Sequence, residues 1–210
     1  MQPGGGLFAF MTTMFPIFLK LEGRRVLVVG AGSVAEGKIR GLLEARATVS
    51  VVAPQATEQV RYWAAAGVLS WRVAEFESSD LEDTLLVVAA TSSRELNAQI
   101  HQQAQKHGVL CNAVDDPENC DFYYPAVVKR GDLQIAISTA GRSPALSQRL
   151  RQELEEQFGP EYEEWVRELG EQREKLTIEK LEPNARRDLL HKIASKEAFV
   201  NRYKSHEGNS

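Results

Sequence analysis

One stretch decides the fold of this chain, residues 25–35, which read Arg25-Val26-Leu27-Val28-Val29-Gly30-Ala31-Gly32-Ser33-Val34-Ala35. Its first half is apolar without alternation, which is typical of a central parallel strand covered by helices on both faces. Two closely spaced glycines then interrupt the run. The next apolar positions recur at helical spacing and make one stripe, formed by Ala35, Ile39, Leu42 and Leu43. The stretch therefore predicts a buried strand, a tight loop and an amphipathic helix.

The loop of this unit has the residues that a phosphate group needs. Gly30, Gly32 and Ala35 match the pattern G-x-G-x-x-G/A, in which glycines allow a tight turn and a close approach of the backbone to a pyrophosphate. The amides at the start of the following helix can then face the anion. The residues that we expect to bind the cofactor here are Gly30, Ala31, Gly32, Ser33 and Val34. The alternative is a glycine turn that serves only the geometry of the backbone.

The end of the second expected strand is unusual for such a domain. Residues 48–52 are followed by Ala53 and Pro54, where an acidic residue usually holds the ribose 2′-hydroxyl of NAD. No arginine stands there to meet the 2′-phosphate of NADP. We expect Ala53 and Pro54 to contact the cofactor, but the spacing alone does not choose between NAD and NADP.

Strand and helix signals alternate through the next part of the chain. The expected elements are a helix at 55–66, strands at 69–73 and 85–90, a helix at 92–107 that ends at Gly108, and a strand at 109–114. This succession predicts an α/β fold with a Rossmann-like doubly wound parallel sheet, whose ligand lies at the carboxyl ends of the strands. Thr91 follows the fourth strand, so we expect it near the cofactor.

The composition limits the possible functions. The chain has 210 residues, of which 43% are hydrophobic and 26% charged, and its net charge is −4, whereas a general nucleic-acid binder is normally basic. No apolar run is long enough to span a membrane. Cys111 and Cys120 are the only cysteines, which is too few for a disulfide framework and favours a reducing cytoplasm. The four histidines have no metal-ligand spacing, so we expect no metal site.

We expect four segments along the chain. Residues 1–13 are glycine-rich and lack a basic region, which indicates a disordered extension rather than a signal peptide. Met14 is an alternative start of the protein. Residues 14–114 form the nucleotide-binding domain. Residues 115–143 contain two strands, at 122–128 and 133–138, that predict an antiparallel hairpin in a small dimerisation and active-site region. Residues 144–210 are charged and predict a helical domain.

Two carboxylates directly follow the fifth strand, at the edge where a doubly wound sheet holds its ligand. Asp115 or Asp116 could act as a general base beside the nicotinamide, or the pair could simply form a turn with Pro117. We choose Asp115 as the catalytic residue, because the residue before a proline is held extended. Asn112, on the strand itself, either orients the substrate or ends the strand.

A second group of polar residues lies before the first helix of the C-terminal part. Ser138, Thr139, Arg142 and Ser143 offer hydroxyl groups, helix-start amides and a guanidinium, which together suit an anionic ligand. We expect all four to bind the substrate. The alternative is a capped helix with Ser143 as the N-cap before Pro144, which leaves Arg142 without a role.

Several ordered motifs resemble those of the precorrin-2 dehydrogenase family of sirohaem synthesis. They are Phe15-Pro16-Ile17-Phe18-Leu19, Val28-Val29-Gly30-Ala31-Gly32-Ser33-Val34-Ala35, Val52-Ala53-Pro54, Ala89-Ala90-Thr91, Cys111-Asn112-Ala113-Val114-Asp115-Asp116-Pro117, Asp121-Phe122-Tyr123-Tyr124-Pro125-Ala126 and Ser138-Thr139-Ala140-Gly141-Arg142-Ser143-Pro144-Ala145. The resemblance runs from about Phe15 into the helices past Leu150. It implies oxidation of precorrin-2 to sirohydrochlorin with NAD as hydride acceptor and, in some members, insertion of ferrous iron into the product.

The resemblance also implies partners and site residues. The family is homodimeric, and the region after the nucleotide domain carries much of the dimer contact and the tetrapyrrole cleft. Its functional aspartate corresponds to Asp115, and it shares the missing ribose acid, which favours NAD. Because precorrin-2 is a polycarboxylate, Arg142, Lys129 and Arg130 are expected to attract it. We expect no methyltransferase domain of the kind that follows in fused sirohaem synthases.

Two other functions stay open at the level of the sequence. One is a non-enzymatic protein that responds to NAD and binds a partner through its helical tail. The other is a different NAD-dependent oxidoreductase. Absence of turnover with intact NAD binding would identify the first, and substrate screening would identify the second.

Overall fold

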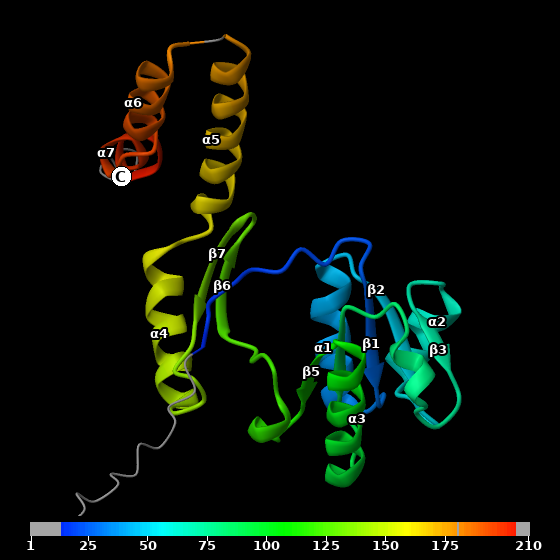
Figure 1. Cartoon of the computed structure of the whole chain (residues 1–210). Coiled ribbons are helices and arrows are strands. Elements are labelled where there is room, and N and C mark those ends of the chain that lie inside the picture. Colours follow the sequence, from blue (N-terminus) through cyan, green and yellow to red (C-terminus); the bar gives the residue numbers. More distant parts are fainter. Residues whose placement is uncertain (1–13, 180, 205–210) are drawn as a thin grey trace, which may run out of the picture. The chain divides into compact units, whose positions relative to one another are not determined.

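The chain divides into two compact units. The computed structural model describes residues 14–179 and 181–204, and the expected extension 1–13 lies outside the described residues. The first unit ends at Tyr124 and the second begins at Pro125 (Figure 1). The sequence predicts this boundary after Val114, ten residues before the observed one. The difference arises because the segment after the fifth strand stays attached to that strand: the amide of Asp121 donates to the carbonyl oxygen of Cys111 at 2.8 Å.

The first unit alternates strands and helices. Its strands are β1 (Arg25–Val29), β2 (Thr48–Val52), β3 (Ser70–Arg72), β4 (Leu86–Ala89) and β5 (Leu110–Ala113). Its helices are α1 (Ser33–Glu44), α2 (Glu58–Ala65) and α3 (Arg94–His107), with the short turns η1 (Ser78–Leu81) and η2 (Pro117–Asn119). Gly108 ends α3 in a left-handed conformation, which glycine adopts without steric cost.

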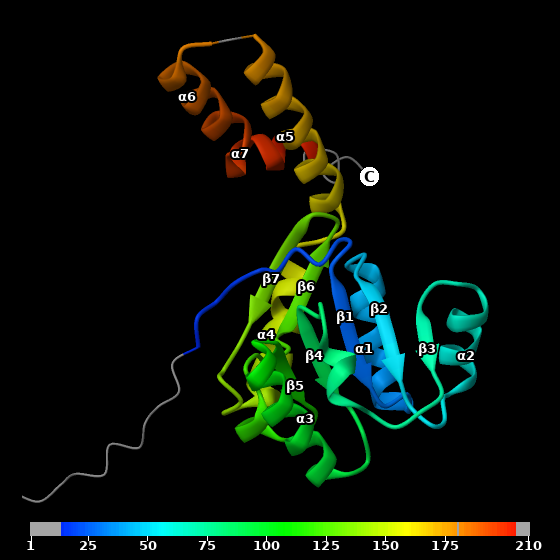
Figure 2. The same cartoon turned by 45° about the vertical axis from the view of Figure 1, so that its right-hand side comes forward.

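The five strands form one parallel sheet in the order β3-β2-β1-β4-β5 (Figure 2). The chain builds outward from β1 through β2 and β3, then crosses to the other side of β1 to add β4 and β5. This is the topology of half a doubly wound sheet, and such sheets bind ligands at the carboxyl ends of the strands where the order reverses, here between β1 and β4. The expected fold class is confirmed.

The central strand β1 supplies side chains to two separate cores of the first unit. Val26 and Val28 pack in the core under α1, together with Ile39. Leu27 and Val29 pack in the other core, which lies under α3. Because successive side chains of a strand point to opposite faces, this double burial explains why the stretch is apolar without alternation.

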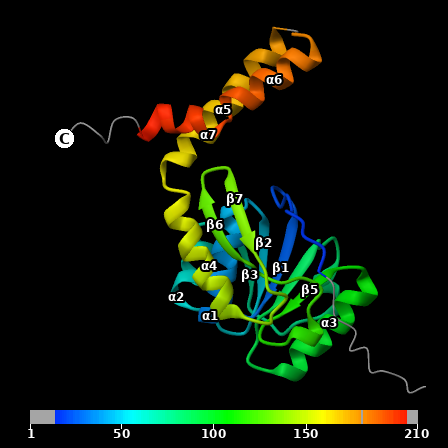
Figure 3. The same ribbon diagram turned by 90° about the vertical axis from the view of Figure 1, so that its left-hand side faces the viewer.

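The second unit starts with a hairpin and continues as helices. β6 (Ala126–Arg130) pairs antiparallel with β7 (Leu133–Ile137), and α4 (Pro144–Gln157) contacts both strands (Figure 3). The first strand begins later than expected, because Phe122 packs against the core under α1 instead. The remaining helices are α5 (Glu161–Ile178), α6 (Pro183–Ile193), α7 (Lys196–Phe199) and the π-helical turn η3 (Val200–Lys204).

Aromatic rings join α5 to α7 at the end of the second unit. The rings of Tyr162 and Trp165 lie 4.4 Å and 4.8 Å from that of Phe199, measured between centroids, so the three rings pack in direct contact. The expected helical C-terminal part is therefore present and has its own small core. No helix in the described part of the chain is long and apolar enough to cross a membrane.

Candidate active site

Gly30 is required by the packing of the protein itself. Its backbone has a φ of +102°, and a Cβ atom at this position would lie only 2.3 Å from the carbonyl oxygen of Ala90. The loops after β1 and β4 approach this closely because the amide of Ala90 donates to Val29 at 2.8 Å, while the amide of Gly30 donates to Val52 at 2.9 Å. A side chain at Gly30 would push these strand ends apart.

Gly32 has a different surrounding. It is the N-cap of α1 with a φ of −80°, which any residue adopts, and a Cβ atom there would meet no heavy atom of the described residues within 4 Å. The fold therefore does not need a glycine at this position. The first amides of a helix have no acceptor inside the helix, and Gly32 offers no side chain to accept from them. The open space and the unsatisfied amides fit a phosphate group at the start of α1.

The other loop residues border this space. Ala31 is buried, whereas Ser33 and Val34 are exposed. The amide of Thr57 donates to the carbonyl oxygen of Ala31 at 3.0 Å, so the loop after β2 is held against the glycine loop. An exposed valine at a helix start gives an apolar contact that a bound nucleotide can cover.

At the end of β2, the neighbouring strand β3 places an arginine that is distant in the sequence. Ala53 is buried and its carbonyl oxygen accepts a hydrogen bond from the indole of Trp71 at 3.0 Å, while Pro54 is exposed. Arg72 lies opposite Val52 in the register of β2 and β3. Its guanidinium is bound by the carboxylate of Asp80 and the carbonyl oxygen of Glu75, so it is already neutralised within the protein.

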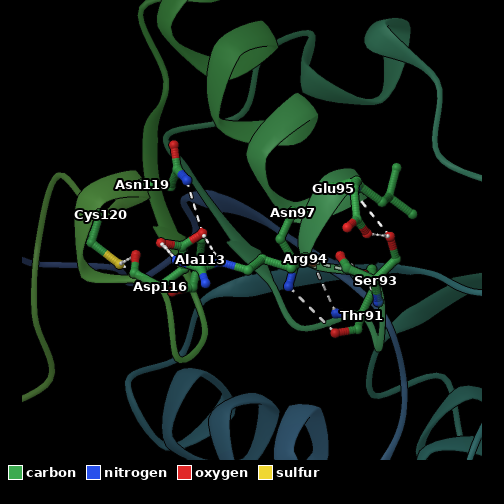
Figure 4. Close-up of polar contacts among 10 residues, drawn as sticks. Thr91, Ser93, Arg94, Glu95, Asn97, Ala113, Asp116, Asn119 and Cys120 are labelled. Carbon is green, nitrogen blue, oxygen red and sulfur yellow. Dashed lines mark hydrogen bonds and ion pairs between the residues drawn. The ribbon is translucent and has the colours of Figure 1, made fainter.

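Thr91 is held by a network that starts on α3 (Figure 4). Its hydroxyl donates to Oδ1 of Asn97 at 2.7 Å and accepts from the amide of Ser93 at 3.2 Å. The amide group of Asn97 also accepts from the backbone nitrogen of Thr91 and donates to its carbonyl oxygen. Thr91 lies at the expected edge of the sheet, and its hydroxyl shapes the loop that approaches Gly30.

Asp116 is used inside the protein. Its side chain is only 3% exposed, and Arg94 donates to both carboxylate oxygens at 3.3 Å while Asn119 donates to one of them at 2.8 Å (Figure 4). The hydrogen bond from the Arg94 guanidinium, followed by that from Asn119, lowers the pKa of Asp116. A carboxylate held ionised in this way is a structural anchor and a poor proton acceptor.

Asp115 has the opposite environment. Its backbone is left-handed, with a φ of +59°, a conformation that aspartate tolerates better than most residues. Hydrogen bonds from the amide of Asp116 to Ala113 and from the amide of Val114 to Ala89 fix this turn at the ends of β5 and β4. The side chain is exposed, and its carboxylate makes no hydrogen bond or ion pair with the residues that the structure describes. Of the two aspartates, Asp115 is therefore the one free to act on a ligand.

Asn112 points into the protein. It is buried, and its side-chain amide donates to the carbonyl oxygen of Phe122 at 2.8 Å and to the sulfur of Cys120 at 3.4 Å. These contacts hold the segment after η2 against β5. Of the two expected roles for Asn112, the geometry favours the structural one.

The four expected substrate-binding residues of the second unit lie together before α4. The hydroxyl of Ser143 caps α4 by accepting from Leu146 at 3.3 Å, and Thr139 accepts from the amide of Ser143 at 3.0 Å. Ser138 accepts from the amide of Ala140. These hydroxyls therefore build the turn, as the capped-helix alternative predicts. Arg142 is exposed, and within residues 14–179 and 181–204 its guanidinium has no partner, so it is the member of the group that a ligand can use.

The guanidinium of Arg130 is already used within the protein and is not available to bind a substrate carboxylate. Its guanidinium donates to the carbonyl oxygens of Phe158 at 2.8 Å and Glu155 at 3.0 Å. These are groups at the carboxyl end of α4, where carbonyls lack partners within the helix. Arg130 therefore serves as a cap of α4. The expectation that it attracts a polycarboxylate is not supported by this geometry.

Sequence reasoning missed several residues of the site. A signal existed for Asn97, because it stands three residues before Ile100 on the apolar face of α3, and a buried amide needs partners. No signal existed for Arg94, since its partner is 22 residues away along the chain. Lys38, on α1, was also missed. Among the described residues, no group of three histidine, cysteine, aspartate or glutamate side chains could hold a metal ion.

Comparison with known proteins relates both units to sirohaem biosynthesis. A family model described as putative NAD(P)-binding matches residues 17–126, and one described as the central region of a sirohaem biosynthesis protein matches residues 130–157. Siroheme synthase 1 of Aeromonas salmonicida is 44% identical over 140 residues, and siroheme synthase 2 of Yersinia enterocolitica is 44% identical over 141 residues. Each match covers 67% of this chain and 30% of the relative, so the chain spans under a third of these proteins.

A solved structure extends the similarity to most of the chain. The structure of SirC, a precorrin-2 dehydrogenase, superposes with a TM-score of 0.77 at 30% sequence identity. The match covers 88% of this chain and 91% of the SirC chain. The similarity therefore includes both compact units and is not confined to the nucleotide-binding sheet.

Proposed function

Because this chain belongs to the precorrin-2 dehydrogenase family, we propose that it oxidises precorrin-2 to sirohydrochlorin with NAD as the oxidant. The observation that carries this proposal is the juxtaposition of two features at one edge of the sheet. The open start of α1 at Gly32 suits a pyrophosphate, and the unpaired carboxylate of Asp115 stands at the ends of the neighbouring strands.

The residues of the glycine loop would hold the cofactor. Gly30 lets the strand ends close, Gly32 would leave room for the pyrophosphate, and the first amides of α1 would bind its charge. Bound NAD supplies a hydride acceptor. The uncharged residues Ala53 and Pro54 support NAD over NADP, because Arg72, the arginine that lies opposite Val52 at the end of β2, is already paired with Asp80.

Asp115 would accept the proton. Oxidation of precorrin-2 removes a hydride and a proton from the macrocycle, so the reaction needs a base as well as the nicotinamide. The free carboxylate of Asp115 can take that proton, whereas the carboxylate of Asp116 is committed to Arg94 and Asn119. The left-handed turn directs the backbone so that the two neighbouring carboxylates have different surroundings.

Arg142 supports the binding of a polycarboxylate. Its guanidinium is free among the described residues and precedes the start of α4, so it can pair with a substrate carboxylate in a bidentate manner. Ser138, Thr139 and Ser143 keep the turn that carries it. We place the substrate contact of the second unit at Arg142 for this reason.

We also propose that the protein is a homodimer. The extended segment at the start of the described chain exposes large apolar side chains, with Phe15 83%, Phe18 68% and Ile17 58% accessible. Contiguous exposed apolar side chains of this size mark an interaction surface. Light scattering at micromolar concentration should give twice the monomer mass, and a monomer mass would contradict the proposal.

A cytoplasmic location fits the two cysteines. Both Cys111 and Cys120 are free thiols, and burial raises the pKa of Cys111 to about 12. Unreactive free thiols suit a reducing compartment. The net charge of −4 supports the view that the partners include no nucleic acid.

Anaerobic incubation with precorrin-2 and NAD tests the proposed activity. Formation of sirohydrochlorin, followed by absorbance and matched by NADH, is the expected result. Intact NAD binding without turnover would instead favour the non-enzymatic alternative, and turnover of another substrate would favour a different oxidoreductase. Addition of ferrous iron to the product mixture tests the iron insertion that the family resemblance implies for some members.

A further inference from the structure

Lys38 is held in a defined place beside the candidate active site. It lies in the second turn of α1 and is half-buried. Its ammonium nitrogen lies 3.7 Å from the centroid of the Tyr124 ring, and the face of an aromatic ring attracts a cation. That ring in turn meets Phe122 edge-on at 5.7 Å, and Phe122 packs against the core under α1. The segment after Asp115 thus returns to α1 and fixes the lysine.

The charge of Lys38 is only partly compensated by the protein. Within the described ranges, no carboxylate lies within ion-pair distance of its ammonium group. The groups that act on it electrostatically are the carboxylate of Asp115 and the thiol of Cys120. Burial lowers the pKa of Lys38 and outweighs the opposing effect of these two groups. The ammonium has therefore lost more hydration than its neighbours replace.

A partly desolvated cation of this kind is stabilised when an anion arrives. The incoming group does not have to displace a full hydration shell, and a charge-assisted hydrogen bond to a carboxylate is stronger than one between neutral groups. The other cationic residue of α1 lacks this property: Arg40, two residues further on, is exposed and already pairs with Glu36 at 3.4 Å. Lys38 is thus the cation on this helix that is prepared for an external anion.

We propose that Lys38 binds a carboxylate group of the tetrapyrrole substrate beside Asp115, and that the ring of Tyr124 holds the ammonium group in place. This inference rests on the proposed function, since it requires a polycarboxylate at the carboxyl edge of the sheet. It gives the first unit a cationic substrate contact of its own.

Steady-state kinetics of matched variants tests the proposal. Lys38→Met should raise the KM for precorrin-2 by roughly 10- to 100-fold, as expected for loss of a hydrogen bond between charged groups, with kcat and the calorimetric Kd for NAD little changed. Lys38→Arg should restore most of the affinity. Tyr124→Leu should raise the KM, whereas Tyr124→Phe, which keeps the ring, should not. Arg40→Met removes the same charge from the same helix and should leave every constant unchanged.

Three results with Lys38→Met would overturn this proposal and leave the proposed function intact. An unchanged KM for precorrin-2 in Lys38→Met would show that Lys38 does not bind the substrate. A loss of NAD affinity would assign Lys38 to the pyrophosphate, and a fall in kcat alone would mean that it acts through Asp115. Failure of the proposed function has a different signature, because the parental protein itself would then not oxidise precorrin-2, and that result overturns both proposals. Far-UV circular dichroism of each variant confirms that the comparison is between folded proteins.

Discussion

Arg94 donates two hydrogen bonds to the buried carboxylate of Asp116, one from Nε and one from Nη2, each 3.3 Å long. The arginine is the first residue of α3 and its side chain is largely exposed, whereas Asp116 follows the turn after β5. The pair therefore ties the start of a helix to the turn that carries Asp115. The anchored carboxylate is the immediate neighbour of the free carboxylate of Asp115 in the chain.

The stability that Asp116 contributes should depend on pH. Because Arg94 and then Asn119 lower its pKa in the folded state, the contribution is fully present above the unfolded-state pKa of about 3.9 and is lost as the pH falls through the folded-state value. Thermal unfolding should thus show Asp116→Asn to be less stable than the parent at pH 7. The difference should shrink at pH values below about 4, and a difference that stays constant would contradict the role of the ion pair.

Asp115→Asn should slow the chemical step. The change keeps the shape of the side chain and removes its basicity, so we expect a rate loss on the order of 10²–10⁴-fold with NAD affinity little changed. Asp116→Asn should affect the rate much less, since that carboxylate is occupied by Arg94. Anaerobic single-turnover rates compare the two variants. Parental turnover in Asp115→Asn, or an inactive Asp116→Asn that is still folded, would reverse the assignment.

Substitutions of the two loop glycines should separate packing from cofactor binding. Gly30→Ala places a Cβ atom against Ala90 at a positive φ, so it should lower the free energy of unfolding by roughly 2–5 kcal/mol. Gly32→Asp enters open space in the protein and should leave stability near that of the parent, while its bulk and charge remove NAD binding. Urea denaturation and calorimetric titration measure the two effects. Unchanged NAD affinity in Gly32→Asp would refute the pyrophosphate site.

Two arginines of the second unit should behave differently when replaced by alanine. Arg142→Ala should raise the KM for precorrin-2 with stability and NAD affinity unchanged, because its guanidinium has no partner in the described part of the protein. Arg130→Ala should instead lower the free energy of unfolding by roughly 1–3 kcal/mol, because it leaves the carbonyl oxygens of Glu155 and Phe158 without their donor. A parental KM for precorrin-2 in Arg142→Ala would mean that Arg142 is a surface residue that does not bind the substrate.

Local patterns predicted most of the first unit because they reflect rules that act within a few residues. The uninterrupted apolar run at residues 26–29 predicted a strand covered on both faces, and β1 indeed feeds two cores. The helices expected at 55–66 and 92–107 are present as α2 and α3, and Thr57 and Ser93 cap their starts. The first strand of the hairpin was placed too early, since the sequence did not show that Phe122 packs in the first unit.

The sequence by itself determined the alternation of strands and helices, the glycine loop and the pair of aspartates after the fifth strand, because backbone preference and hydrophobic period are local properties. Only the tertiary structure decided which aspartate is free. Asp115 and Asp116 are chemically identical neighbours, and they differ because folding brings Arg94 to one of them and leaves the other exposed in a left-handed turn. The same holds for Lys38, whose surroundings are made by Tyr124 and Asp115 from the far end of the unit. Contacts between residues distant in sequence set burial and charge, and these decide what each side chain can do.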